Sequence, residues 1–199
     1  MDKYYVEAFP DPGSDESKGN KSSLKRFLID VSETLILSVV LFLIINAISA
    51  RIRIESISMQ PTLYEGDFVI VNRLAYKLGE PGRGDVVVFH FPPDPQREPY
   101  IKRVVGLPGE TVRINQGHVF VNDIAIREPY IKASPNYQGE WHVPEGQLFV
   151  LGDNRNNSSD SHSWGMVPLE NVIGKAEVIY LPISHWRVLT PSIAIAAEP

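Results

Sequence analysis

The chain has 199 residues, of which 43% are hydrophobic and 22% are charged, a composition typical of a folded globular protein. Its net charge of -5 and the lack of a dominant basic block argue against a general nucleic-acid binder. With 0 cysteines, the chain can form no disulfide bond, thiol nucleophile or cysteine–zinc site, although this does not identify its compartment.

The N-terminal quarter of the chain predicts a tail followed by a membrane anchor. Residues 1–30 are mostly hydrophilic, with prolines and glycines typical of a flexible cytoplasmic tail. An uncharged apolar run, residues 35–50, extends back to Val31 with only Glu33 as an interruption. These roughly 20 residues match the length that a helix needs to cross a bilayer, so we predict a transmembrane anchor over residues 31–50. A buried core helix and a cleavable secretory signal are the alternatives, and the late start of the run favours an uncleaved signal anchor.

Basic residues flank the apolar run and predict its orientation. Those before it are Lys18, Lys21, Lys25 and Arg26, and those after it are Arg51 and Arg53. The slight N-terminal excess favours a cytoplasmic N-terminus. Residues 51–199 are then an extracytoplasmic catalytic domain on the outer side of the membrane, whether that side is periplasmic, extracellular or lumenal.

Residues 51–199 predict a mostly β domain, because short β-rich runs alternate with turn residues. The Asn122-Asp123 pair predicts a tight hairpin, and Arg73–Leu78 is the one segment that suggests a short helix. The fold class expected is curled antiparallel sheets behind one N-terminal transmembrane helix. The predicted strands are Ile52–Ile57, Asp67–Asn72, Asp85–Phe91, Tyr100–Val105, Thr111–Ile114, His118–Asn122, Gln147–Leu151 and Val172–Leu181.

Ser58 is a candidate nucleophile at the predicted end of the first strand. Pro61 disfavours helix at the residue before it, so the chain should turn there and expose the Ser58 hydroxyl. Ser56, two residues earlier, lies on the same face, and its hydroxyl can join the Ser58 N–H in binding an oxyanion. An ordinary strand-end serine would have the same pattern, so the hypothesis requires a base.

Lys102 is the candidate base. It lies in an apolar strand with Ile101, Val104 and Val105, whereas lysine is rarely buried without a partner. An apolar pocket can lower a lysine pKa from about 10.4 to about 7–8, where the neutral amine accepts a proton. Arg103 should point to the opposite face and form a structural ion pair. The alternative is an edge-strand lysine that reaches solvent.

A long polar loop, residues 152–165, lies between two apolar segments. Alone it is typical of a surface turn cluster or an oxygen-rich cation site, although it lacks the spacing of a calcium loop. Ser158 could hold the lysine amine, and Asp153 could pair with Arg103. The five histidines are scattered without His-x-x-x-His spacing, so no metal site is expected.

Four blocks that follow the anchor in order, S-x-S-M-x-P-T-L, G-D-x-V, K-R-V-x-G-x-P-G-E and G-D-N-R-x-N-S-x-D-S-x-x-W-G, resemble the type I signal peptidases, or leader peptidases. This resemblance implies a membrane-bound serine endopeptidase with a Ser–Lys dyad and no cofactor. It would remove N-terminal signal peptides from exported precursors after small residues (Ala-x-Ala). Its partners would be signal peptides and the lipid bilayer.

The resemblance also implies residue roles. Ser58 matches the nucleophile, Lys102 the general base, Ser56 with the Ser58 N–H the oxyanion hole, and Ser158 the serine that orients the lysine. Two departures concern the polar loop: His162 stands where arginine is frequent, and Asn156 where aspartate is common. Structural positions match Arg103, Asp153 and Asp160, and substrate-pocket positions match Ile54, Met59, Leu63, Val69, Tyr100 and Ile101.

Two other functions fit parts of the sequence. One is a self-cleaving serine–lysine protein like the SOS-response repressors, for which Ala194-Ile195-Ala196 offers a cleavage site, although the helical DNA-binding module is missing. The other is a membrane-tethered β-domain binding module without chemistry. The host membrane, the preferred precursors and the oligomeric state do not follow from the sequence.

Overall fold

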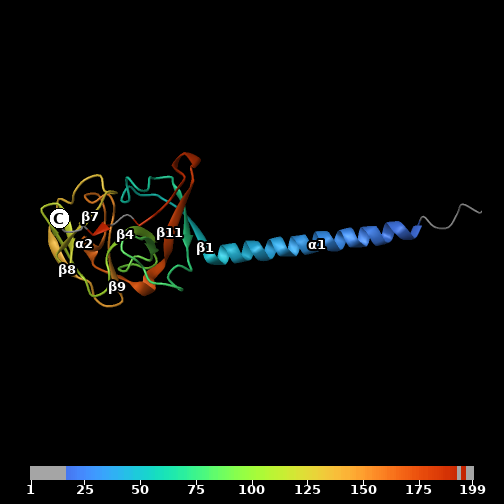
Figure 1. Ribbon diagram of the computed structural model, residues 1–199, viewed down its shortest axis with the longest axis horizontal. Helices are drawn as coiled ribbons and strands as arrows, with labels where there is room; N and C mark the ends of the chain where they lie inside the picture. The colour runs from blue at the N-terminus through green and yellow to red at the C-terminus, as the bar shows by residue number, and fades with distance from the viewer. Residues whose placement is uncertain (1–16, 192–193, 196–199) are drawn as a thin grey trace, which may run out of the picture. The chain divides into compact units, whose positions relative to one another are not determined.

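The computed structural model describes the backbone of residues 17–191 and 194–195, and the side chains of residues 23–191 (Figure 1). The chain divides into two compact units, Met1–Ile45 and Asn46–Pro199. The division into tail, anchor and β domain at residues 30 and 50 stays a prediction, and residues 1–16 of the expected tail lie outside the described residues.

A single long helix, α1, covers Ser17–Ile48 and is drawn in blue in Figure 1. It begins inside the residues that we expected to form a tail, because Leu24, Phe27 and Leu28 continue the apolar pattern toward the N-terminus. The part that covers Ser23–Ile48 has 26 residues and a mean hydropathy of 2.4, and it is not buried against the protein. At about 1.5 Å per residue it reaches about 39 Å, enough by length and composition to cross a membrane.

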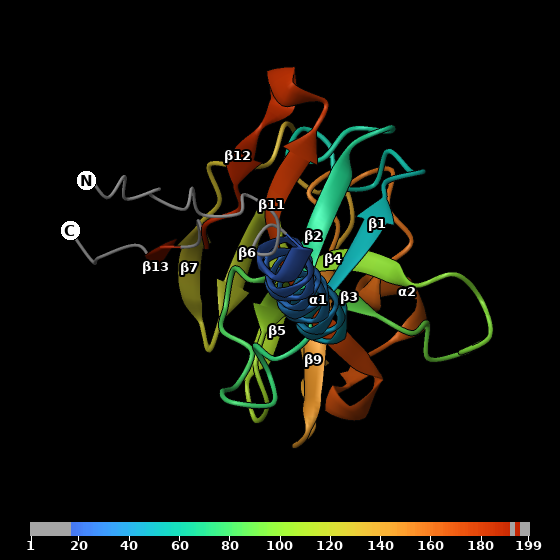
Figure 2. The same cartoon turned by 90° about the vertical axis from the view of Figure 1, so that its right-hand side faces the viewer.

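The larger of two antiparallel sheets contains eight strands. Their spatial order is β1-β2-β11-β3-β4-β9-β10, with β12 paired to β11. The long strand β11, drawn in orange-red next to β2 in Figure 2, pairs with β2 and with β3 and so lies between them in the sheet, although it comes late in the chain. The bounds are β1 Ser49–Arg53, β2 Phe68–Asn72, β3 Val86–Phe89, β4 Tyr100–Gly106, β9 Gln147–Leu151, β10 Val167–Pro168, β11 Val172–Leu181 and β12 Arg187–Val188.

The second antiparallel sheet contains five strands in the order β13-β7-β6-β5-β8. The turn between β6 and β7 is the predicted hairpin, with Asn122 and Asp123 at φ 48° and 66°, the left-handed values that a tight hairpin turn requires. The bounds are β5 Thr111–Asn115, β6 His118–Val121, β7 Ile124–Arg127, β8 Gly139–His142 and β13 Ala194–Ile195. The helical turns are α2 Ser161–Trp164, η1 Leu169–Asn171 and η2 Ile183–His185.

The predicted fold class, mostly β with curled antiparallel sheets, is confirmed, while two of its elements differ. The first strand ends at Arg53 rather than Ile57, because the chain leaves the sheet after Ile54, whose backbone makes the last pair of hydrogen bonds. The helix predicted over Arg73–Leu78 is wrong. That segment forms turns, because the Asn72 side chain accepts a hydrogen bond from the Leu74 N–H at 2.9 Å and closes the chain locally.

Strand β4 is central to the packing of the domain. Ile101, Val104 and Val105 each belong to a different one of three hydrophobic clusters. Every residue of β4 after Tyr100 is buried. A side chain on this strand is therefore surrounded by packed apolar groups whether it points to one face or the other, and this is the strand that carries Lys102.

Candidate active site

The structure brings Ser58 and Lys102 into direct contact. Lys102 Nζ lies 2.8 Å from Ser58 Oγ, across 44 residues of sequence. Both residues are buried, with 7% and 4% of their surfaces exposed. Lys102 Nζ also donates to the carbonyl of Ile101 at 3.0 Å. A hydroxyl and an amine held this way have the geometry of a nucleophile and its base.

The polar loop after β9 holds Ser58 in place. The Asn154 N–H donates to the Ser58 carbonyl at 3.0 Å, and the Asn154 side chain donates to the Ile57 carbonyl at 3.1 Å. Gly152 makes the close approach possible, since a Cβ there would lie 2.5 Å from the Ser58 carbonyl oxygen. Sequence reasoning missed Asn154 because its role depends on which distant backbone the loop meets.

Two hydrogen-bond donors flank the Ser58 hydroxyl. Ser56 Oγ lies 3.2 Å from Ser58 Oγ, so the two side chains share a face as predicted. The backbone N–H of Ser58 donates to no acceptor among the described residues. A free N–H and a neighbouring hydroxyl are the type of donors that stabilise an oxyanion.

Burial makes the Lys102 amine a weaker base. Desolvation lowers its pKa from the usual value near 10.5 to about 8, against the opposing effect of the Asp160 and Asp153 carboxylates. The Tyr100 ring, 5.4 Å from Nζ, covers it further. About a tenth of the amine is therefore neutral at pH 7, against less than about a thousandth for an ordinary lysine.

Arg103 points away from Lys102 and forms a buried bidentate ion pair. Its Nε and Nη2 lie 2.8 and 2.7 Å from the two carboxylate oxygens of Asp153, and Nη1 donates to the Gly84 carbonyl at 2.8 Å. Burial disfavours the charged guanidinium, but the hydrogen bonds and the negative charge of Asp153 outweigh this effect, so the pKa of Arg103 is raised. The pairing between β4 and the polar loop, expected from sequence, is present.

A second buried ion pair had no sequence signal. Arg155 is bidentate to Glu128, at 2.7 and 2.6 Å, and its Nε donates to the Gly152 carbonyl. Only 0% and 5% of the two side chains are exposed. Glu128 lies in a segment with no recognisable motif, so only the folded chain identifies it as the partner that fixes the loop.

Ser158, the expected lysine orienter, makes no such contact here. Its hydroxyl is buried and has no hydrogen-bond partner among the described residues. It lies beside the nucleophile, since Ser158 Oγ and the Ser58 carbonyl oxygen are 2.2 and 2.5 Å from the point where a Gly152 Cβ would lie. Its role toward Lys102 stays a prediction.

Asp160 is fully buried and begins α2. Its carboxylate accepts from the Gly152 N–H at 2.9 Å and lies 2.5 Å from His162 Nδ1. Asn156, the other departure, joins the loop to a neighbouring turn through the Asn136 N–H and the Ser134 carbonyl. Both departures therefore keep the polar loop connected to the rest of the domain.

A cleft of about 670 Å³ opens at the dyad. Of the predicted substrate residues, Ile54, Tyr100 and Ile101 line it together with Ser58 and Lys102. One wall is the chain that leaves β1, and the other is the start of β4. The cleft therefore runs directly past the candidate nucleophile.

The other predicted substrate residues, Met59, Leu63 and Val69, do not line this cleft. All three are fully buried in the hydrophobic cluster beneath it, which also contains Ile54 and Ile101. They can affect a substrate only through the side chains that they support.

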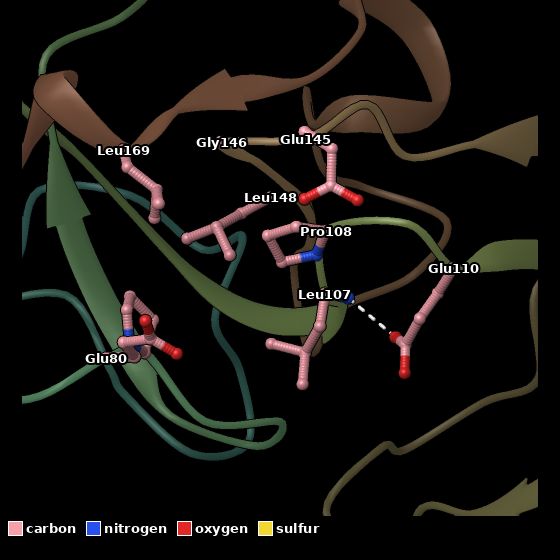
Figure 3. Close-up of a pocket in the computed structure, with 9 residues that line it drawn as sticks. Glu80, Leu107, Pro108, Glu110, Glu145, Gly146, Leu148 and Leu169 are labelled. Carbon is pink, nitrogen blue, oxygen red and sulfur yellow. Dashed lines mark hydrogen bonds between the residues drawn. The ribbon is translucent and has the colours of Figure 1, made fainter.

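A separate cavity of about 480 Å³ shares no residue with the cleft at the dyad (Figure 3). Glu80, Glu110 and Glu145 surround its mouth together with leucine and proline side chains. Glu110 is already paired with Arg83 and accepts the Leu107 N–H at 2.7 Å, the dashed line in Figure 3. No serine, threonine or lysine lines this cavity, and among residues 23–191 no cluster of His, Asp and Glu could hold a metal.

Comparison with known proteins places the chain in a family. The signal peptidase, peptidase S26, family matches residues 28–181. A probable signal peptidase I-2 of Synechocystis sp. is 41% identical over 181 residues, which cover 87% of this chain and 83% of that protein. The chain belongs to the signal peptidase S26 family. Signal peptidase I of Leptolyngbya laminosa is 45% identical over 173 residues, with 82% and 85% covered.

The family match confirms the predicted resemblance and the enzyme class, a signal peptidase I hydrolase. The alternative function, a membrane-tethered binding module without chemistry, is therefore wrong, because the family is one of enzymes. A solved signal peptidase I from Enterococcus faecalis is 32% identical and covers 49% of this chain and 97% of its own, with a TM-score of 0.44.

Replacing Lys102 by methionine should stabilise the domain. The folded chain holds the Lys102 pKa near 8, below its unfolded value, so the unfolded chain binds more protons between pH 8 and 10.5 and stability rises with pH there. Lys102→Met should therefore unfold at higher urea concentration at pH 7, by up to about 3 kcal/mol, with the gain shrinking toward pH 10.5. Equal stabilities of Lys102→Met and the unmodified protein at all pH values would contradict a buried amine with a lowered pKa.

Replacing Arg103 by alanine should unfold the domain more easily, because Asp153 is then a buried charge without a partner. The expected loss is about 3–5 kcal/mol in urea denaturation followed by tryptophan fluorescence. The matched control is Arg97→Ala, whose ion pair with Asp94 is more than half exposed and should contribute less than about 0.5 kcal/mol. Similar losses for the two variants would argue against a structural role for Arg103.

Proposed function

We propose that this protein is a membrane-bound serine endopeptidase that removes N-terminal signal peptides from exported precursors, with Ser58 as nucleophile and Lys102 as general base. The observation that carries the proposal is the 2.8 Å hydrogen bond between Ser58 Oγ and a buried Lys102 amine, in a chain of the signal peptidase family. The names of the relatives, signal peptidase I, support the substrate class.

The chemistry follows from the dyad geometry. Neutral Lys102 takes the Ser58 proton while Ser58 Oγ attacks the scissile carbonyl carbon, and the ammonium then protonates the leaving amine. An acyl ester on Ser58 remains. Lys102, neutral again, deprotonates a water molecule that attacks the ester and returns the proton to Ser58 Oγ as the peptide acid leaves.

The two donors beside Ser58, its own N–H and the Ser56 hydroxyl, would stabilise the oxyanion of each tetrahedral intermediate. The Ser58 N–H has no other acceptor among the described residues, and the Ser56 hydroxyl is 3.2 Å from Ser58 Oγ. Neither donor has to move far to reach a developing negative charge. Such preorganised donors are worth about 10²–10³ in rate each.

The cleft favours an extended substrate. Strand β4 pairs with β3 from Tyr100 onward, but β9 joins its other side only at Arg103. The edge of residues 100–102 is therefore open toward the cleft, and the chain at Glu55 and Ser56 on the opposite wall makes no backbone hydrogen bond among the described residues. A peptide strand can add to these edges and bring its carbonyl to Ser58.

Small residues at the cut follow from this placement. In an extended peptide the side chains one and three residues before the cut point to the same side. Here that side would face Ile54 and Ile101, which are 2% and 7% exposed and already packed into the core beneath. Little room remains for a large side chain, which supports an Ala-x-Ala preference.

We propose that α1 is the membrane anchor. Its apolar span is 26 residues long and its side chains are not buried by the protein. Ser32, Thr34 and Ser38 donate their hydroxyls to carbonyls of the preceding turn, so these polar side chains need no water. Anchoring would hold the enzyme on the surface where signal peptides are themselves embedded, which raises their effective concentration.

Cleavage of a precursor with an Ala-x-Ala site should depend on both dyad residues. Ser58→Ala and Lys102→Ala should each lower kcat/KM by at least about 1000-fold while circular dichroism stays unchanged. For the unmodified protein, kcat/KM should rise with pH through about 8 and then level off, because only neutral Lys102 accepts the proton.

The control is the same precursor with the residue before the cut changed from alanine to leucine. It should be cleaved at least about 100-fold more slowly. Near-normal turnover by either dyad variant, or a pH profile flat from 6 to 10, would contradict the mechanism. Equal cleavage of both precursors would contradict only the substrate preference.

The absence of cysteine from the chain allows a direct test of its orientation. Leu78 is 86% exposed in the β domain, so a Leu78→Cys variant should react with a membrane-impermeant maleimide in intact cells. Ser22→Cys, on the other side of the apolar span, should react only after permeabilisation. The reverse pattern would place the β domain in the cytoplasm, and labelling of both in intact cells would contradict a membrane-spanning α1.

A further inference from the structure

Two buried carboxylates act on Lys102, and they differ in their counter-ions. Asp153 is neutralised by the Arg103 guanidinium through two short hydrogen bonds. Asp160 is equally buried, but its side-chain partner is an imidazole, His162, with Nδ1 at 2.5 Å. A guanidinium keeps its charge at every pH at which the protein is folded, whereas an imidazole is cationic only in acid solution. The two carboxylates are therefore compensated by groups of different chemical type.

Asp160 lies close enough to the dyad for this to matter. Its second oxygen accepts the Gly152 N–H at 2.9 Å. Gly152 in turn packs closely against Ser58, because a Cβ on Gly152 would lie only 2.5 Å from the Ser58 carbonyl oxygen. The Asp160 charge opposes the effect of burial on the pKa of Lys102 more strongly than that of Asp153 does. Asp160, Gly152, Ser58 and Lys102 are all buried, so solvent screens the interaction between the two charges only weakly.

Among the charged and titratable groups around Asp160 and His162, His162 is the one whose charge we expect to change with pH. The His162 ring stacks on Tyr137 at 4.0 Å and 13°, and burial together with Asp160 raises the pKa of that phenol, which stays neutral. Nearby Arg155 is neutralised by Glu128. On the lysine side, the amine contacts the Ser58 hydroxyl, the Ile101 carbonyl and the Tyr100 ring. The other charged groups on that side are the Asp153–Arg103 pair and the side chains of Arg53, Glu55 and Glu98, which line the same cleft.

We propose that His162 is a titratable counter-ion of Asp160 and thereby a positioning residue that adjusts the basicity of Lys102 to the surrounding pH. The inference rests on the proposed dyad function. In acid solution the imidazolium cancels the Asp160 charge, so Lys102 releases its proton more easily. In alkaline solution the neutral imidazole leaves that charge uncompensated, and Lys102 binds its proton more tightly. The enzyme would then lose less activity on acidification than an enzyme whose basic lysine has surroundings of constant charge.

The test compares the unmodified full-length protein with His162→Arg and His162→Gln in detergent, on one Ala-x-Ala precursor. Arginine supplies a permanent cation that still reaches Asp160 and stacks on Tyr137, and glutamine supplies a permanent neutral donor. Each kcat/KM profile is normalised to its own alkaline plateau. The acid limb is the part of the profile where activity falls with falling pH, and its midpoint in the arginine variant should lie about 0.5–1 pH unit below the midpoint in the glutamine variant. At pH 6 the normalised activity of the arginine variant should therefore be about three- to tenfold higher.

The unmodified protein should show the signature of a titrating counter-ion. Its profile should follow the glutamine variant at alkaline pH and approach the arginine variant in acid. The matched control is His118→Arg, which adds the same charge on β6, where the exposed His118 side chain makes no contact with the dyad. Its acid limb should coincide with that of the unmodified protein.

Coinciding acid limbs for His162→Arg and His162→Gln would overturn the inference, whatever happens to their plateaus or melting temperatures. A purely structural His162 would change those two quantities and leave the limb in place. A limb that moves equally in His118→Arg would also overturn it, because net charge would then be the cause. Failure of the dyad itself would give a different result, the loss of the acid limb from the unmodified protein.

Discussion

The site depends on one constraint, the removal of the Lys102 amine from water. Strand β4 contributes to three hydrophobic clusters, so the lysine that it carries is surrounded by packed side chains on all sides except the cleft. Its direct polar partners are the Ser58 hydroxyl and the neighbouring Ile101 carbonyl. Desolvation therefore dominates, and the pKa falls to about 8. The same desolvation that should cost stability at this position would make the amine a usable base in the mechanism that we propose.

The other buried charges of the domain are treated differently. Among the described residues, the buried Asp67, Asp85, Asp153, Asp160, Arg103 and Arg155 each have an ionisable side chain of complementary type within 2.8 Å. Lys102 is the buried ionisable side chain whose partners are uncharged. Buried charges are costly unless they are paired, so this contrast between Lys102 and a structural ion-pair framework supports the role that we propose for Lys102. The framework joins β4 to the polar loop, and the loop in turn holds Ser58.

Sequence periodicity located most strands of the domain because alternation of apolar and turn residues is a local property. It failed at Arg73–Leu78, which has helix-forming residues but forms turns that the neighbouring Asn72 side chain closes. It also failed at the end of the first strand, because the chain leaves the sheet after Ile54. The position of β11 between β2 and β3 also has no local signal. Pairing partners depend on the whole set of buried faces rather than on one segment.

The sequence by itself determined the family and the enzyme class, and it pointed to the residues that we propose carry the chemistry, because four short blocks with fixed spacing are specific without any coordinates. It also identified the Arg103–Asp153 pairing. Only the tertiary structure decided that Ser58 and Lys102 meet at 2.8 Å, that Met59 lies beneath the cleft rather than in its wall, and that the His162 imidazole contacts the Asp160 carboxylate. The reason is physical: desolvation and charge compensation are properties of a packed interior, and no stretch of chain contains them alone.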